Sequence, residues 1–136
     1  MEISNKNVIV TGGANGIGKA LAKAFKNAGA SYILIADLDE TEGQRTADEL
    51  GIKFKKTDVS SESDIIELIA TANIDTKSID IFCSNAGIGG APMLLDVSTE
   101  DWQNIWEINV MSHIYAAKNV LPQMIEKGSG YLMNTA

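Results

Sequence analysis

The residues best suited to chemistry lie in a glycine-rich segment at residues 11–18, directly after the apolar run at residues 8–10. Its glycines stand at positions 12, 16 and 18, and a helical pattern begins within it. A strand that leads through such a turn into a helix N-terminus presents several backbone N–H groups, and the helix dipole favours an anion there. Glycine also lets the backbone approach a pyrophosphate closely. The segment therefore predicts a phosphate-binding turn.

The same glycines admit other interpretations. Residues 13–19 fit the start of a P-loop, G-x-x-x-x-G-K, but Ala20 stands where a P-loop carries the Ser or Thr hydroxyl that binds magnesium. The spacing of the glycines also differs from the commoner dinucleotide pattern G-x-G-x-x-G. A tight strand-to-helix turn without any ligand would look similar, so residues elsewhere in the chain must decide.

A carboxylate follows at the distance that a dinucleotide site needs. Asp37 closes the apolar run at residues 32–36, about 20 positions after Gly18. At the tip of a second strand, it can accept hydrogen bonds from the hydroxyls of an adenosine ribose. It would also repel the 2′-phosphate of NADP, and Asn15 brings no cation to attract that phosphate. Both features favour NAD, with an ordinary strand-end or helix-capping carboxylate as the alternative.

The elements that must position these residues follow from the hydrophobic pattern. Strands are expected at residues 8–11, 32–36, 52–57, 79–84 and 131–134, with helices between them. Continuous apolar runs are typical of parallel strands covered on both faces, and the alternation implies right-handed βαβ units. We predict an α/β fold in one domain, residues 1–136: a Rossmann-like, doubly wound parallel sheet that stops after its fifth strand. Ligands of such sheets bind at the carboxyl ends of the strands, where the glycine turn, Asp37, Asp58 and Asn85 all fall.

The helices carry further expectations. The first should bury Ile17, Leu21, Ala24, Phe25 and Ala28, and Ser61 with Asp64 should form a capping box. A long helix starts after Ser98 or Thr99 and should pack on the sheet through Trp102, Ile105, Trp106, Ala116, Ala117 and Val120, until Pro122 kinks or ends it.

Two polar residues share a face with that apolar set. Asn109 is interpreted as a structural bond-maker or part of a site, and His113, with no carboxylate or nucleophile beside it, as a core or interface histidine. Because the other faces of this helix are apolar too, we expect a homo-oligomer that forms through residues 99–127.

Composition narrows the classes of function. The chain has 136 residues and a net charge of −7, which argues against nucleic acid or an anionic membrane surface as partner. We find no signal peptide and no apolar run long enough to span a membrane. The one cysteine, Cys83, excludes an internal disulfide and lies in an apolar run, so we expect a buried thiol and a reducing, cytoplasmic location.

Taken together, the motifs resemble those of the short-chain dehydrogenases/reductases of the common single-domain type. The resemblance covers the whole chain and rests on residues in family order and spacing: Thr11-Gly12-x-x-x-Gly16-Ile17-Gly18, Asp37, Asp58-Val59, Asn85-Ala86-Gly87, Asn109 and the strand at residues 130–135. The P-loop interpretation does not explain the later motifs.

The resemblance implies NAD as cofactor and a role for each matching residue. The pyrophosphate and its ribose would lie against the glycine turn, and the adenosine ribose would lie at the end of the second strand. The adenine would lie after the third strand, and the underside of the cofactor would rest on the end of the fourth strand. The residues concerned are Gly12, Asn15, Gly16, Ile17, Gly18, Asp37, Leu38, Asp58, Val59, Asn85, Ala86 and Gly87. Asn109 resembles the catalytic helix asparagine that positions a water in a proton relay. No metal ligand belongs to this set.

The sequence also departs from the family pattern. Ser84 stands where many relatives have a second asparagine, which should weaken a sheet-bracing bond. The family's serine would be expected just beyond Ala136, and no Tyr-x-x-x-Lys is found, since Tyr115 is followed four residues later by Asn119. We therefore expect the N-terminal, NAD-binding part of an oxidoreductase for a secondary alcohol or ketone, inactive alone. The alternative is a non-catalytic dinucleotide-binding module that ends at Ala136.

Overall fold

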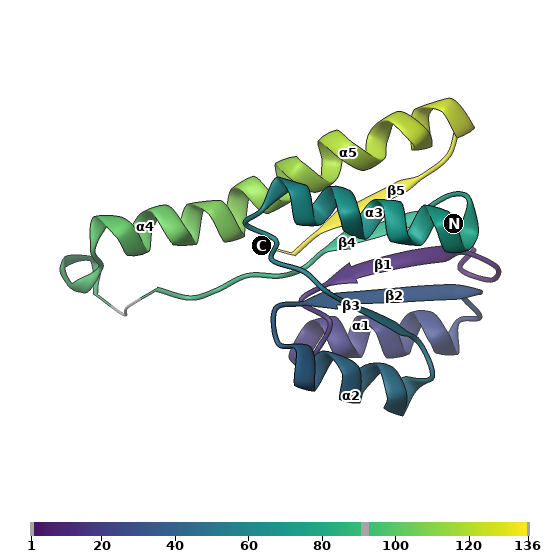
Figure 1. The fold of residues 1–136 in the computed structure, drawn as a ribbon, viewed down its shortest axis with the longest axis horizontal. Helices are drawn as coiled ribbons and strands as arrows, with labels where there is room; N and C mark the ends of the chain where they lie inside the picture. The colour runs from purple at the N-terminus through teal and green to yellow at the C-terminus, as the bar shows by residue number, and fades with distance from the viewer. Residues whose placement is uncertain (1, 91–92, 136) are drawn as a thin grey trace.

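The computed structural model describes residues 2–90 and 93–135, in which strands and helices alternate along the chain (Figure 1). The strands are β1 (Asn7–Thr11), β2 (Tyr32–Asp37), β3 (Lys53–Lys56), β4 (Ile81–Ser84) and β5 (Tyr131–Asn134). The helices are α1 (Gly16–Asn27), α2 (Glu40–Leu50), α3 (Glu62–Thr76), α4 (Thr99–Trp106) and α5 (Ser112–Lys127), with a 3₁₀ turn η1 (Leu94–Asp96) and a π segment η2 (Glu107–Met111).

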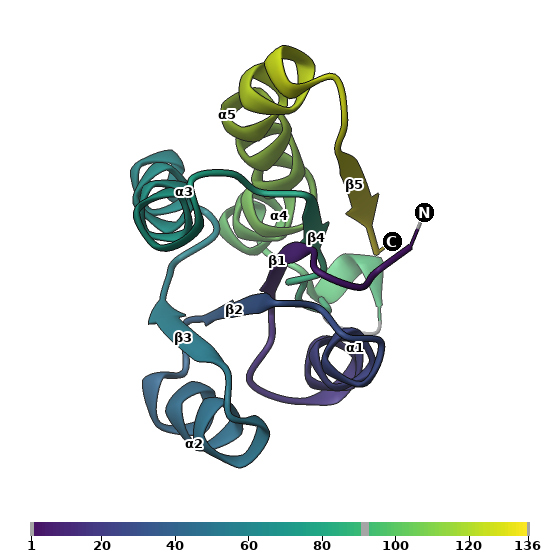
Figure 2. The same cartoon turned by 90° about the vertical axis from the view of Figure 1, so that its right-hand side faces the viewer.

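The five strands form one parallel sheet in the order β3-β2-β1-β4-β5. β1 lies at the centre, where Val10 is paired with Ile35 of β2 and with Cys83 of β4. Helices α3 and α5 cover one face and α1 and α2 the other, as the two views agree (Figures 1 and 2). The order reverses at β1, so the α/β, doubly wound, Rossmann-like prediction is confirmed, and the crevice at the reversal lies beside the glycine turn.

Apolar side chains fill both layers, as the continuous runs predicted. Strand residues such as Ile9 and Phe82 join α3 and α5 in one cluster, while Val8, Val10 and Ile35 join α1 and α2 in the other. Neighbouring residues of β1 therefore pack into opposite helix layers, and both faces of the strand are buried. The carboxyl ends of the strands are held rigidly as a result, which is what a site built there requires.

Helix α1 buries a different face from the one expected. Its fully buried residues are Gly18 and Ala22, while Leu21 and Phe25 are half-buried. Ala24 and Ala28 are exposed, and Ile17 is 63% exposed. Small residues let the helix axis approach the sheet closely, and the larger Ile17 is left beside the carboxyl edge.

The long helix also differs from the prediction. Ala116 and Val120 of α5 pack into the core, but Trp102 and Trp106 of α4 are 48% and 52% exposed. The π segment adds a residue to one turn and so rotates α4 relative to α5, and α4 extends past the sheet (Figure 1). Pro122 does not end the helix, which continues to Lys127.

The described residues contain no helix long and apolar enough to cross a bilayer. Over the same ranges, no group of three or more His, Cys, Asp or Glu side chains is placed to hold a metal ion.

Candidate functional site

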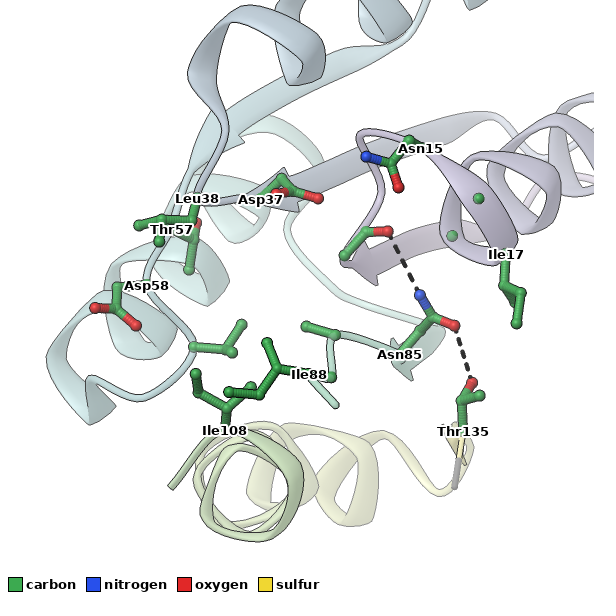
Figure 3. A pocket seen from close by; sticks show the side chains of 16 residues that line it. Asn15, Ile17, Asp37, Leu38, Thr57, Asp58, Asn85, Ile88, Ile108 and Thr135 are labelled. Carbon is green, nitrogen blue, oxygen red and sulfur yellow. Dashed lines mark hydrogen bonds between the residues drawn. The ribbon is translucent and has the colours of Figure 1, made fainter. Parts of the chain in front are cut away.

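A cleft of about 540 Å³ opens at the carboxyl ends of the strands, where the sheet order reverses (Figure 3). Every residue that the sequence assigned to a cofactor lines it: Gly12, Asn15, Gly16, Ile17, Gly18, Asp37, Leu38, Asp58, Val59, Asn85, Ala86 and Gly87. They come from four strand ends and the first turn of α1, and the parallel sheet brings them together. The remaining lining residues are Thr57, Ile88, Ile108 and Thr135.

The glycine turn forms one wall of this cleft, and two of its glycines are required by close contacts. A Cβ on Gly18 would lie 1.9 Å from the carbonyl oxygen of Gly12, and one on Gly12 would lie 2.9 Å from the Cα of Ala86. Gly12 and Gly16 also have φ values of +65° and +53°, which L side chains rarely adopt. The turn thus packs on itself and on β4 while its outer backbone faces the cleft.

The N-terminus of α1 differs from those of α2, α3 and α4. Asp39, Ser61 and Ser98 cap α2, α3 and α4 through backbone N–H groups, at 3.0, 3.3 and 3.1 Å. At α1 the Asn15 side chain makes no capping bond with the described part of the chain, and the first turn carries no acidic residue. Its N–H groups and the positive end of the helix dipole therefore face the cleft. This geometry suits an anionic group such as a pyrophosphate.

The Ser61 cap confirms the predicted start of α3, with one difference. Asp64 does not accept the backbone N–H of Ser61 as a capping box would; its Oδ1 accepts the Ser61 hydroxyl at 2.9 Å and its Oδ2 accepts the N–H of Asp58 at 3.0 Å. That bond, with the Ser61 hydroxyl, lowers the pKa of Asp64. It also fixes the segment after β3 that lines the cleft.

Asp37 ends β2 beside the glycine turn that leads into α1. Its Oδ2 accepts the N–H of Ala14 at 3.0 Å and its Oδ1 accepts the N–H of Asp39 at 3.1 Å. The carboxylate is thereby held at the cleft, with lone pairs left for hydroxyl donors. Leu38, 62% exposed, places an apolar side chain next to it. A ribose diol beside a flat apolar ring would fit this pair.

Asp58 and Val59 lie at the end of β3, beyond Asp37. The Oδ1 of Asp58 accepts the Ser60 N–H at 3.0 Å and the Ser60 hydroxyl at 2.6 Å. Val59 is buried in the core cluster that α3 and α5 share. The pair therefore offers the cleft one polar and one apolar contact on a fixed backbone.

Asn85 ties three chain segments together beneath the cleft (Figure 3). Its Nδ2 donates to the Thr11 carbonyl at 3.1 Å, and its Oδ1 accepts the Thr135 hydroxyl at 3.1 Å. The Thr11 hydroxyl in turn accepts the N–H groups of Asn85 and Ala86, at 3.0 and 3.2 Å. The ends of β1, β4 and β5 are thus locked in one network, which supports the floor of the site.

Sequence reasoning missed four lining residues, and the signals for them differ. Thr57 and Thr135 each follow a strand at the carboxyl edge, so the rule that selected Asp37 would have included them. Ile88 comes directly after the Asn-Ala-Gly run. Ile108 had no signal of its own, because the helix that carries it is far away in the sequence.

Asn109 lies in the π segment and does not line this cleft; it borders a second cavity of about 430 Å³ beside Trp102 and Trp106. Its Oδ1 accepts the N–H of Ile88 and its Nδ2 donates to the Ile88 carbonyl, both at 2.8 Å. The side chain therefore fastens the helix to the strand-end segment that forms the cleft floor.

A second bond, one helical turn further along, joins α5 to the end of β4. Nδ1 of His113 lies 2.7 Å from the Ser84 hydroxyl. Desolvation lowers the pKa of His113, which is half-buried and bonded, although the Ser84 hydroxyl lies beside it where the sequence indicated no such group. Ser84 thus gains a partner that the departure from the family pattern had not suggested. Neighbouring Cys83 is buried as predicted, and burial raises the pKa of its thiol to about 12, so it stays protonated.

Comparisons with known proteins agree with this geometry. A family profile described as "short chain dehydrogenase" matches residues 6–136. The chain is 34% identical over 140 residues to "Uncharacterized oxidoreductase YvrD" of Bacillus subtilis, covering 100% of this chain and 52% of that protein. An oxidoreductase of Staphylococcus aureus is 31% identical, with 98% of this chain and 59% of the relative covered. The chain thus spans between half and three-fifths of the length of these curated relatives.

Solved structures match along the whole chain as well. A short-chain dehydrogenase/reductase from Burkholderia phymatum in complex with NAD superposes with a TM-score of 0.96 at 27% identity, covering 100% of this chain and 50% of that one. The 3-ketoacyl-(acyl-carrier-protein) reductase of Brucella melitensis complexed with NADH gives 0.94 at 29% identity, covering 98% and 58%.

Proposed function

Because the chain belongs to the short-chain dehydrogenase family, we propose that it is the cofactor-binding part of an NAD-dependent oxidoreductase acting on a secondary alcohol or ketone. The observation that carries the proposal is the cleft itself. It joins an open helix N-terminus, a backbone cradle that admits only glycine and a strand-end carboxylate. A dinucleotide needs these three features in this order along its length.

The residues present fit NAD. The first turn of α1 and the backbone of Gly12 would hold the pyrophosphate, since the close packing of Gly12 and Gly18 keeps the turn against β4 and leaves its outer backbone facing the cleft. Asp37 would accept the hydroxyls of the adenosine ribose, and Leu38 with Val59 would flank the adenine. Asn85, through Thr11 and Thr135, would keep the floor under the rest of the cofactor rigid. Bound NAD would supply the hydride acceptor, and the protein would supply its position.

Preference for NAD over NADP is part of the proposal. Asp37 places a negative charge where NADP carries its 2′-phosphate, and Asn15 adds no positive charge. The two similar structures named above hold NAD and NADH.

Asn109 is proposed as a catalytic residue by resemblance. Both polar groups of its side chain bond Ile88, so a relay water would be held by the helix backbone around it. The π segment opens the backbone there, and such segments are frequent at functional sites. The Asn109 side chain would keep the backbone of the π segment against the cleft floor.

We propose that these 136 residues alone catalyse no turnover, because the expected acid/base is not among them. Tyr115 does not replace it: desolvation and the carboxylate of Glu107 raise the pKa of its hydroxyl, which donates to that carboxylate at 3.2 Å. A general acid/base at neutral pH needs the opposite shift.

The remaining elements of the proposal concern assembly and location. The exposed Trp102 and Trp106, with Ile114 on α5, give the 99–127 helix an apolar surface suited to a second copy of the chain. A single buried cysteine fits a reducing, cytoplasmic environment.

The test is calorimetric titration of the purified chain with NAD in the presence of a chelator. The proposal predicts saturable binding without magnesium and no reduction of NAD with a panel of secondary alcohols. Binding that requires magnesium would instead support a P-loop nucleotide site. Turnover with any alcohol would contradict the expected inactivity, and the absence of NAD binding would overturn the proposal.

A further inference from the structure

Thr46 of α2 makes an unusual bond for a helical threonine. It is fully buried, and its hydroxyl donates to the carbonyl oxygen of Ala14 at 2.6 Å, across 32 residues of sequence. In α3, by contrast, Thr71 and Thr76 donate to carbonyls one turn back in their own helix, at 2.8 and 2.7 Å. Thr46 does not line the cleft. Thr46 therefore bonds the glycine turn from outside the cleft.

The bond completes a clamp on a single residue. Ala14 is 1% exposed, its carbonyl accepts the Thr46 hydroxyl and its N–H donates to Oδ2 of Asp37. The preceding residue is fixed as well, because Gly13 donates its N–H to the Ala36 carbonyl at 3.1 Å. The backbone at Ala14 is therefore held by α2 on one side and by the end of β2 on the other.

We propose that Thr46 is a positioning residue for dinucleotide specificity, acting through Ala14 on the carboxylate of Asp37. Ala14 supplies the bond that fixes Oδ2 of Asp37, so any movement of its backbone changes where the carboxylate points. The next two residues, Asn15 and Gly16, line the cleft, so the same movement displaces the pyrophosphate wall. This inference rests on the proposed function, since it assigns a role in selecting NAD at that cleft.

The test compares two variants that differ in one hydroxyl. Thr46→Val keeps the shape but leaves the buried Ala14 carbonyl without its donor, whereas Thr46→Ser keeps the donor. We expect Thr46→Val to weaken NAD binding by about threefold to tenfold, because a displaced Asp37 carboxylate would lose about one hydrogen bond to the ribose. NADP binding should change less, so the ratio of NAD to NADP affinity falls. Thr46→Ser should restore both to within about twofold of the wild type.

A matched control separates positioning from stability. Thr76→Val removes a similar helical hydroxyl, which bonds the Ala72 and Ser78 carbonyls at the far end of α3. It should lower Tm while leaving the affinity ratio unchanged. If Thr46→Val also lowers Tm without changing the ratio, Thr46 is only structural and the inference is wrong.

Two further outcomes are decisive. Should Thr46→Val fail to fold, Thr46→Ala leaves room for a water on the Ala14 carbonyl, and the inference predicts a smaller fall in the same ratio; an unchanged ratio overturns it. If the wild-type chain binds no NAD, the proposed function is wrong. If the wild type binds NAD and the variant binds it equally well, only the role of Thr46 is wrong.

Discussion

Replacing Asp37 tests the origin of cofactor preference, and two substitutions separate its two roles. Its carboxylate faces the cleft, and it also accepts the N–H of Ala14, which is 1% exposed. Asp37→Ala removes both roles. Asp37→Asn removes the charge but keeps the bond to the turn, because the amide oxygen can still accept the buried Ala14 N–H, while the exposed N–H of Asp39 loses its acceptor and can bond water instead.

The expected magnitudes follow from these contacts. A hydrogen bond to a charged group contributes about 1.5–3 kcal/mol, so losing one ribose contact in Asp37→Ala should weaken NAD binding by about 10-fold to 150-fold. NADP should bind more tightly in both variants, since the repulsion of its 2′-phosphate is gone. Unfolding should become easier by about 1–3 kcal/mol in Asp37→Ala alone, because the buried Ala14 N–H loses its acceptor.

The assay is calorimetric titration of each variant with NAD and NADP at one ionic strength, together with thermal melting. Asp37→Asn should melt like the wild type and still lose its preference for NAD. An NAD-to-NADP ratio that stays the same in both variants would refute the role assigned to the carboxylate. A loss of preference only in the variant that melts early would assign the effect to the turn rather than to charge.

Other regions give sharper yes-or-no outcomes. Gly18→Ala should abolish measurable NAD binding, because its Cβ would lie 1.9 Å from the carbonyl oxygen of Gly12. Gly89→Ala, whose Cβ meets open space, should bind NAD normally. Equal binding by the two variants would contradict the role of the close-packed glycine turn. Burial lowers the pKa of His113, so its neutral form is favoured in the folded chain and stability falls on acidification. His113→Asn, which can bond Ser84 without titrating, should therefore lose less Tm than wild type between about pH 7.5 and about pH 5.5, and an equal loss would disprove the linkage. Trp106→Lys should convert an oligomer to a monomer in light scattering, and an unchanged mass would exclude the α4 surface as the interface.

Much of the cleft could be predicted from the sequence because parallel strands share one carboxyl edge. The glycine turn, Asp37 and Asn85 follow apolar runs and Asp58 follows a lysine-rich strand, so the carboxyl ends of these strands meet at one edge whatever the strand register. Glycine spacing added the phosphate turn, and its close contacts explain why glycine is needed there.

The faces of the helices were less predictable. In α1 the sheet is approached by Gly18 and Ala22, small residues that a hydrophobic pattern underrates, and Ile17 is left at the cleft. In the long helix, the π segment shifts the phase between Trp106 and Ala116, so no single period describes both halves. Backbone irregularity of this kind leaves no mark in a hydrophobic pattern.

Bonds between distant elements were not predictable at all. Thr46 reaches Ala14 and His113 reaches Ser84 through side chains whose types are common in helices and strands. The role of Thr46 and of His113 depends on which residue the fold places opposite each side chain. They are also the contacts that hold the cleft walls in place.

The most direct test of the central claim is to map NAD on the chain by backbone amide chemical shifts in a ¹⁵N-labelled sample. The cleft predicts saturable shifts at Gly16, Gly18, Leu38, Val59 and Ala86. Adenosine should reproduce only those at Leu38 and Val59, because it lacks the pyrophosphate and the second nucleoside. Shifts that cluster away from these residues, or none at millimolar NAD, would contradict a dinucleotide site at the carboxyl edge of this sheet.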